Sequence, residues 1–390
     1  MLTSKLMRAA CAATLLLLLF YSRGGRAQTP APPSPSNPSQ SVSPAQPATA
    51  EPAAQQPMSP FPEMVPDESG TGLTVLRAIE SYSELTLKGS DLHAVEPLLG
   101  SREKTPDFVR ELWQLRWRPN DPIDLWVILP RGVKNPPVVL YLYGYPSETD
   151  RFRNSDYCRR ITHGGVAAVG FVSAFTGHRT EYRPLNETFT KKLPEALVST
   201  VHDIQMILDY LQTRGDLDMN HVGIFGQGSG GSIAILTAAV EPRLKVLDLL
   251  DPWGDWPAWF AGEPDFQPIE RAEYLKPDFQ KAIEPLDPLR SLPQLKSQKI
   301  RMQFDADTGE PKEAVDRIAA AAPGSAQVVR FPSSRDMYSA NSGGRLFEWI
   351  ATQLGAHPAL PATAEVSATP DKPNSPVRPE QPKSAPAKTN

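Results

Sequence analysis

One stretch of the sequence decides the fold, Val222-Gly223-Ile224-Phe225-Gly226-Gln227-Gly228-Ser229-Gly230-Gly231. Its first residues, Val222 to Phe225, are typical of a strand that is buried on both faces. The residues after the glycines, Ser232 to Val240, are small or apolar and favour a helix. The stretch therefore predicts a strand, a sharp turn and a helix in direct succession.

Apolar runs on both sides of this turn predict further buried strands. They lie at 137–144 and 166–172 before the turn, and at 246–250, 300–304 and 328–331 after it. Helical spacing of apolar residues predicts helices over 197–211, 312–321 and 345–354. Alternating strands and helices of this kind indicate a mostly parallel sheet with helices on both faces.

The first strands of the sheet are expected to be antiparallel. Apolar and polar residues alternate from Trp113 to Arg118, and a second apolar run follows from Leu125 to Leu129. The intervening Asn120-Asp121-Pro122 is a turn sequence. These residues predict an N-terminal antiparallel hairpin at the edge of the sheet.

The strand, turn and helix resemble the nucleophile elbow of the α/β-hydrolase fold, G-x-S-x-G. The order of elements over 110–355 is similar to that fold, and to its dienelactone-hydrolase and prolyl-oligopeptidase-like esterase branch. Gly226 and Gly230 match the two flanking glycines, but Gly228 stands where the family carries its serine. Glycine cannot form an acyl-enzyme. The alternative is a shifted register with Ser229 as nucleophile, in which Gly231 matches and Gln227 does not.

The resemblance also implies a histidine base after the last strand and a carboxylate after the strand at 300–304. The stretch 332–339 holds no histidine, and His357 lies beyond the final helix. Asp307 is the best match for the acid and Asp305 the next. Without a base, a carboxylate there has no catalytic partner; its alternative role is to cap a helix or a turn.

Other residues could line a ligand site at the carboxyl edge of the sheet, where α/β folds bind ligands. The resemblance implies backbone N–H donors from Tyr145 and Ser229 for an oxyanion. His178 is the one histidine expected near the pocket. The stretch 251–260 either closes a lid over the core or forms an aromatic ligand wall, with Trp253, Trp256, Asp251 and Asp255 as its candidates.

A dinucleotide site is the rival interpretation of the glycines. Gly226, Gly228 and Gly231 imitate G-x-G-x-x-G, and Asp248 follows Gly226 by 22 residues. However, that fingerprint belongs to a first βαβ unit, and here five strands precede it. No cofactor is therefore expected. His93 and His163 lack partners at metal-ligand spacing, so no metal is expected either.

Composition and charge exclude some functions and divide the chain. The 390 residues carry 40 basic and 44 acidic side chains, which does not fit a nucleic-acid binder. Of 42 prolines, twelve lie in 28–66 and eight in 358–390. We expect a disordered linker at 28–66, one domain at 67–355 and a disordered tail at 356–390.

The first 27 residues predict a cleaved signal peptide. Lys5 and Arg8 precede an apolar run that is too short to span a membrane, and small residues precede cleavage near Ala27. Export to the periplasm or the extracellular space is therefore expected, with no stable membrane anchor. Removal of Cys11 leaves Cys158 as the one thiol, expected to be half-buried in a helix.

Two functions remain open from the sequence. The first is an exported α/β-hydrolase-fold protein whose Ser-His-Asp triad is degenerate, a pseudoenzyme that acts as a ligand-binding or scaffold protein. The alternative is an active serine hydrolase of ester or peptide bonds that uses Ser229, assisted by His178 or an acidic residue. In both cases the expected partner is a small molecule, an ester or a peptide.

Overall fold

The computed structural model describes residues 80–90, 92, 95–118, 121–144, 149–175, 179 and 185–358, with the backbone alone for 95 and 185–191. All of them belong to one unit of the chain, Ile79–Asn390. The predicted signal peptide, the linker and the tail beyond 358 lie outside the described residues. None of the described helices has the length and apolar character needed to cross a membrane.

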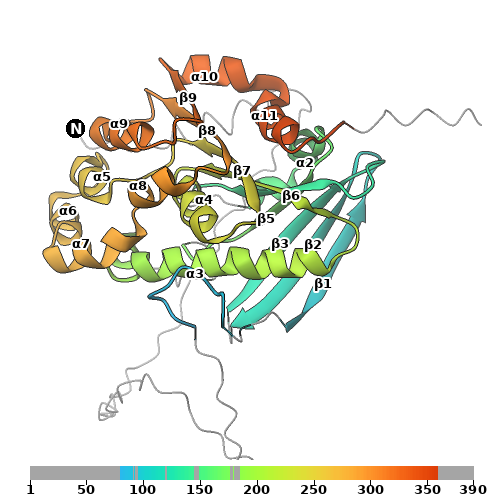
Figure 1. Ribbon diagram of the computed structural model, residues 1–390, viewed down its shortest axis with the longest axis horizontal. Coiled ribbons are helices and arrows are strands. Elements are labelled where there is room, and N and C mark those ends of the chain that lie inside the picture. Colours follow the sequence, from blue (N-terminus) through green and yellow to red (C-terminus); the bar gives the residue numbers. More distant parts are fainter. Residues whose placement is uncertain are drawn as a thin grey trace, which may run out of the picture. The chain divides into compact units, whose positions relative to one another are not determined.

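A nine-stranded sheet forms the centre of the domain, in the order β1-β2-β3-β5-β4-β6-β7-β8-β9 (Figure 1). The pairs β1–β2, β2–β3 and β3–β5 are antiparallel, and every other neighbouring pair is parallel. This confirms the predicted fold class. The strands are β1 (Val95–Lys104), β2 (Phe108–Arg118), β3 (Asp121–Pro130), β4 (Pro137–Leu142), β5 (Ala167–Phe171), β6 (Asp218–Gln227), β7 (Leu244–Leu250), β8 (Lys299–Asp305) and β9 (Gln327–Phe331).

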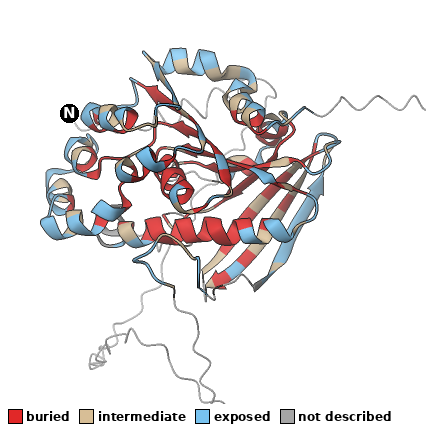
Figure 2. Ribbon diagram, in the orientation of Figure 1, coloured by how far each residue is buried: buried red, intermediate tan, exposed pale blue. Residues whose placement is uncertain are grey.

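Helices cover both faces of the sheet and bury two separate apolar cores (Figure 2). On one face, α3 and α4 contribute residues such as Ile204 and Ile233. On the other, α2 and α11 contribute Ile161 and Ile350. The described helices are η1 (Asp150–Arg153), α2 (Ser155–Thr162), α3 (Leu185–Thr213), α4 (Ser229–Val240), α5 (Trp256–Gly262), α6 (Pro268–Tyr274), α7 (Pro277–Ile283), η3 (Glu284–Leu286), α8 (Pro288–Ser291), η4 (Leu292–Gln294), α9 (Lys312–Ala320), α10 (Ser334–Asn341), η5 (Ser342–Gly344) and α11 (Arg345–Gln353).

The predicted hairpin is present as β2–β3, but it is not the edge of the sheet. Strand β1 pairs outside β2 and is itself the edge. Its sequence lacks the alternation of a half-buried strand: it contains Pro97 and Gly100, its register with β2 shifts twice, and Leu98 and Leu99 are exposed. Proline and irregular register are typical of edge strands, and they hide the strand from pattern analysis.

Cys158 is more buried than expected. The side chain is fully buried in α2, and its Sγ donates to the carbonyl oxygen of Phe152 at 3.1 Å. Burial raises the pKa of the thiol, which disfavours the reactive thiolate. Cys158 is therefore a packing residue, and the prediction of half burial was wrong.

An ion network ties the segment before β1 to α3. We call Glu80, Arg118, Asp121, Arg179 and Asp203 the N-terminal ion network. The Arg118 guanidinium lies 2.6 Å from both Glu80 and Asp203, and Arg179 lies 2.6 Å from Asp203 and 2.7 Å from Asp121. Asp203 is fully buried. Because a buried charge is costly without partners, this network holds the segment in place.

His202 of α3 supports the same segment. Its Nδ1 lies 2.6 Å from Glu80 Oε1, and its Nε2 lies 2.8 Å from the Glu84 carbonyl oxygen. Although burial opposes it, hydrogen bonds from Arg118 and His202 lower the pKa of Glu80 to about 2. This histidine is a buried structural residue.

Candidate functional site

The turn between β6 and α4 has an unusual backbone at Gly228. Its φ and ψ are +55° and −123°, and it is the residue that immediately precedes α4. Its N–H donates to the Leu250 carbonyl oxygen at 3.0 Å, and its own carbonyl oxygen accepts from Gly231 at 2.9 Å. A residue with a side chain in such a conformation costs about 1–3 kcal/mol. Gly228 is therefore the apex of the turn. Its conformation would strain any residue with a side chain, and glycine avoids most of that strain.

Three neighbouring glycines are needed for close packing instead. A Cβ on Gly230 would lie 2.3 Å from the Leu142 carbonyl oxygen, and one on Gly226 would lie 2.6 Å from the Gly230 carbonyl oxygen. A Cβ on Gly231 would lie 2.8 Å from Pro252. By contrast, a Cβ on Gly228 would meet Trp253 at 3.5 Å, an ordinary contact. The turn has the close approach of β4, β6 and α4 that the elbow resemblance implies.

Ser229 begins α4 and is 5% exposed. The end of β4 lies beside it, because a Cβ on Gly144 would be 3.9 Å from Ser229 Oγ and 3.4 Å from the Gln227 carbonyl oxygen. The loop that follows Gly144 therefore starts next to the turn, as an oxyanion loop requires. Tyr145 in that loop lies outside the described residues.

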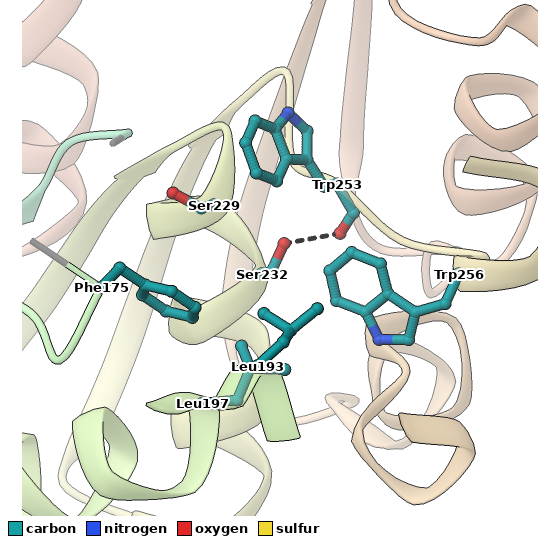
Figure 3. A pocket seen from close by; sticks show the side chains of 7 residues that line it. All are labelled: Phe175, Leu193, Leu197, Ser229, Ser232, Trp253 and Trp256. Atoms are coloured by element: carbon teal, nitrogen blue, oxygen red, sulfur yellow. Dashed lines mark hydrogen bonds between the residues drawn. The ribbon is translucent and has the colours of Figure 1, made fainter. Parts of the chain in front are cut away.

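A small pocket opens below the turn (Figure 3). Its cavity is about 10 Å³, which is the space that a single water molecule needs. With Trp253 in its present position, the cavity has room for about one water molecule. Apolar side chains make up most of the wall, which consists of Phe175, Leu193, Leu197, Trp253 and Trp256 together with Ser229 and Ser232.

Both predicted tryptophans reach this pocket, in different ways. Trp256 is buried, and its Nε1 donates to the Leu286 carbonyl oxygen at 2.9 Å. Trp253 is only half-buried; its Nε1 donates to Glu310 Oε1 at 2.7 Å, and its ring stacks on Trp259 with the centroids 4.6 Å apart. Trp256 belongs to the core, whereas Trp253 is the outer wall of the pocket.

Asp251 lies at the carboxyl end of β7 and is buried. It has a positive φ of 45°, and its Oδ1 accepts from the Asp305 N–H at 2.8 Å. Burial, together with the Asp305 carboxylate, raises the pKa of Asp251 to about 7. A carboxyl with this pKa can exchange a proton near neutral pH.

Glu310 lies near Asp251 and Glu263 lies near Glu310, and sequence analysis missed both. Burial raises the pKa of Glu310 well above its usual value, and the charges of Asp251 and Glu263 raise it further. Burial also raises the pKa of Glu263. We call Asp251, Glu263 and Glu310 the carboxyl cluster. Within the described ranges, no lysine or arginine forms a salt bridge with any of the three. Nothing in the local sequence Gly309-Glu310-Pro311 distinguishes it from a surface turn.

Asp255 has a structural role away from this pocket. It precedes α5 with a φ of +56°, and its N–H donates to Asp287 Oδ1 at 2.9 Å. Its own carboxylate lies 3.1 Å from the Arg317 guanidinium. Asp255 is not among the residues that line the pocket.

The two candidate acids after β8 differ sharply. Asp307 is exposed, and its Oδ2 accepts from the Ser334 N–H at 3.2 Å. Asp305 is 6% exposed, and its Oδ2 accepts from the Ser334 hydroxyl. Ser334 follows β9, where the resemblance implies the histidine base. Asp305 is therefore the buried carboxylate that faces the position implied for the histidine, and the residue that it contacts there is Ser334.

Histidines are absent from the pocket wall over the described residues. His221 pairs with Asp218 at 2.7 Å near the start of β6, and His163 and His357 are exposed. His178 lies outside the described residues. In the part of the chain that the structure covers, no group of three or more His, Cys, Asp or Glu is placed to hold a metal ion.

Asp248, which the dinucleotide interpretation needed, is committed to the sheet. It is fully buried, and its two oxygens accept from the Arg301 guanidinium at 2.8 and 2.6 Å. A ribose would have to displace that buried ion pair. The position is therefore unsuited to binding a dinucleotide.

A solved structure with a TM-score above 0.5 supports the fold assignment. Acetyl xylan esterase 1 from Thermoanaerobacterium sp. JW/SL YS485 superimposes with a TM-score of 0.52 at 14% identity, covering 65% of this chain and 88% of that one. An acetyl xylan esterase from Paenibacillus sp. R4 has a TM-score of 0.49 at 18% identity, with 62% and 83% covered. A glucuronoyl esterase from Solibacter usitatus has a TM-score of 0.45 at 13% identity, with 66% and 86% covered. The chain has the α/β-hydrolase fold. No protein-family model matches it, and no curated protein is significantly similar in sequence.

Proposed function

We propose that this protein binds a ligand beside the β6–α4 turn and does not cleave it through a Ser-His-Asp triad. The observation that carries the proposal is Gly228 at the strained apex of the turn. A nucleophile must project from that apex, and glycine has nothing to project. Because glycine also avoids the strain of this conformation, a glycine at position 228 favours stability but leaves the apex without a nucleophile.

The position after β9 supports the same proposal. Asp305 is buried and oriented as an acid would be, but its partner is the Ser334 hydroxyl. A serine hydroxyl cannot serve as a general base near neutral pH, whereas an imidazole can. Among the described residues, this acid thus has no histidine base to orient.

An active hydrolase is the second candidate, and the location of Ser229 favours it. Ser229 lines the pocket, and the acetyl xylan esterase with the TM-score of 0.52 is an esterase by name. Against it, Ser229 is the first residue of a regular helix rather than a strained apex. An ester or peptide would be its substrate class.

Export belongs to the proposal as well. The basic, apolar and small-residue order of residues 1–27 supports a signal peptide that is cleaved near Ala27. Sequencing the N-terminus of the secreted protein tests it directly: residue 28 as the first residue is expected, and Met1 would contradict export by this route.

Ester turnover separates the two functions. We expect the wild-type protein and Ser229→Ala to hydrolyse p-nitrophenyl acetate at the same rate, no faster than a heat-denatured sample. Ser232→Ala is the matched control, because Ser232 also lines the pocket and lies on the same helix. A rate that falls in Ser229→Ala and not in Ser232→Ala would contradict the proposal.

A further inference from the structure

Trp253 occupies the space in front of the apex. A Cβ built on Gly228 would lie 3.5 Å from both Cε2 and Nε1 of Trp253, so the N–H edge of the indole faces that position. A serine hydroxyl at 228 would project from that Cβ and compete with the indole for room. The protein thus fills with its own side chain the place where a molecule bound at the apex would lie.

The indole can leave while the main chain stays in place. The backbone is held by the Trp253 carbonyl oxygen, which accepts from Ser232 Oγ at 2.8 Å, and by the Trp253 N–H, which lies 3.4 Å from the Gly228 carbonyl oxygen. The side chain makes one hydrogen bond, to Glu310, and is half-buried. Among the described residues, rotation of the side chain therefore breaks its hydrogen bond to Glu310, its tilted ring contact with Trp259 and its packing against the core.

Departure of the indole would expose a prepared aromatic site. Trp259 would form one wall, because it stacks on Trp253 at 4.6 Å with the planes 30° apart. The apolar residues Phe175, Leu197 and Trp256 already line the pocket below. Glu310 would lose its hydrogen-bond donor, and a buried polar group without a partner is unfavourable.

The closed arrangement also leaves a polar group unsatisfied. Trp259 is 3% exposed, and its Nε1 has no hydrogen-bond partner among the described residues. An unsatisfied buried donor is rare in native structures and calls for an explanation. If the Trp253–Trp259 pair opens to admit a ligand, the closed packing need not satisfy every polar group, which accounts for the unpaired Trp259 Nε1.

We propose that this pocket binds a planar aromatic molecule that carries a hydrogen-bond donor, such as a phenol or an indole, and that Trp253 is its gate. The ligand replaces the indole of Trp253, stacks on Trp259 and donates to Glu310. This inference rests on the proposed function, because it makes the apex a binding position. It adds the ligand class and the residue that controls access.

Two probes of equal shape test the proposal. Indole has an N–H, and benzofuran has an oxygen in its place. The full chain is labelled with 5-fluorotryptophan and titrated with each probe while fluorine NMR is recorded, with Trp253→Phe identifying the Trp253 resonance. We expect indole to shift that resonance and to leave the Trp349 resonance on α11 unchanged. Indole should bind about tenfold more tightly than benzofuran, as one hydrogen bond requires.

Variants at Glu310 identify the acceptor. Glu310→Ala should abolish the preference for indole over benzofuran, whereas Glu310→Gln, which keeps an acceptor oxygen, should retain it. Glu313→Ala on the neighbouring helix α9 is the control and should behave as wild type. An unshifted Trp253 resonance at saturating indole, or equal affinity of the wild-type protein for both probes, would overturn the proposal.

The outcomes separate this inference from the proposed function. Failure of indole to bind, in a protein without Ser229-dependent turnover, overturns the gate and leaves a binding protein for another ligand class. Ser229-dependent turnover overturns the proposed function, whether or not indole shifts the Trp253 resonance.

Discussion

Two groups of buried carboxyls in this molecule are stabilised in opposite ways. In the N-terminal ion network, every carboxylate faces an arginine, and the pKa values of Glu80 and Asp121 are lowered. In the carboxyl cluster beside the β6–α4 turn, no arginine or lysine forms a salt bridge within the described ranges. Burial raises the pKa of all three members there. The carboxylates of the first group pair with arginines, whereas burial in the second group favours the protonated form of each carboxyl.

The difference matches the proposed division between a region that serves the fold and a region that binds a ligand. Buried groups with matched partners fix the position of a segment, as Arg118 does for the residues before β1. Buried carboxyls without cations are unfavourable when charged, and such groups concentrate at functional sites. The raised pKa values therefore mark the elbow side of the molecule, although the residues that the structure describes assemble no triad there.

Removing the central cation of the N-terminal ion network should have the largest effect. Among the described residues, Arg118→Met leaves buried Asp203 paired with Arg179 alone and Glu80 with His202 alone, so we expect the free energy of unfolding to fall by about 3–5 kcal/mol. Urea denaturation measures it. Arg159→Met is the control, because Arg159 is half exposed in its pairs with Asp107 and Asp156. A loss below about 1 kcal/mol for Arg118→Met would show that the network is not structural.

The glycines of the turn should differ from one another. Gly230→Ala places a Cβ 2.3 Å from the Leu142 carbonyl oxygen, and we expect a loss of about 3 kcal/mol because the backbone must shift. Gly228→Ala has room for its Cβ and should lose about 1–2 kcal/mol from its positive φ. Equal losses in thermal or urea unfolding would contradict the distinction between packing and conformation at this turn.

The two groups should also give stability opposite dependences on pH. A group whose pKa is raised by folding stabilises the protein below its unfolded pKa, and this contribution is lost as pH rises through the folded pKa. For Asp251 the loss spans about pH 4 to 7, with a slope of at most about 1.4 kcal/mol per pH unit for one proton. Asp251→Asn should reduce this fall in stability between about pH 4 and 7.

The loss of stability at acidic pH should come from the N-terminal ion network. Because the pKa of Glu80 is lowered to about 2, its stabilisation is present above about pH 4.5 and is lost as pH falls toward 2. Unfolding measured from pH 2 to 9 on wild type, Asp251→Asn and the exposed control Asp307→Asn checks both losses of stability. A wild-type stability that rises between pH 5 and 8 would contradict the assignment of the carboxyl cluster.

Placing a serine hydroxyl at position 228 should have the smallest effect. We expect Gly228→Ser to show no gain in p-nitrophenyl acetate hydrolysis, because Ser334 stands opposite Asp305 and the described residues place no histidine in the pocket wall. Strong esterase activity in this variant would show that a histidine already reaches the apex. His178 would then be the first residue to substitute.

Sequence patterns could predict the fold because it depends on periodicity and chain order. The runs at 222–225 and 246–250 are strands of the parallel sheet, and the glycines of the turn lie where the motif places them. Strand β1 escaped prediction because Pro97 and Gly100 interrupt its pattern. Its position is set by pairing with β2, which is a tertiary effect.

The site was predictable only in part. Motif spacing located Gly228 and Ser229, and the position after the strand at 246–250 located the two pocket tryptophans. Sequence analysis ranked Asp307 above Asp305, whereas the structure buries Asp305 against Ser334 and leaves Asp307 exposed; which carboxylate turns inward depends on that distant contact. Glu310 left no trace in the sequence, since its burial comes from Trp253, 57 residues away. Contacts between distant segments decide these cases.

The central claim is that no serine of this protein acts as a nucleophile at the β6–α4 turn. Treatment with a fluorophosphonate, followed by intact-mass spectrometry, tests it most directly, because a nucleophilic serine gains one covalent adduct. We predict no adduct on the folded wild-type protein, with an active serine esterase labelled in parallel as the positive control. A stoichiometric adduct that disappears in Ser229→Ala would contradict the account.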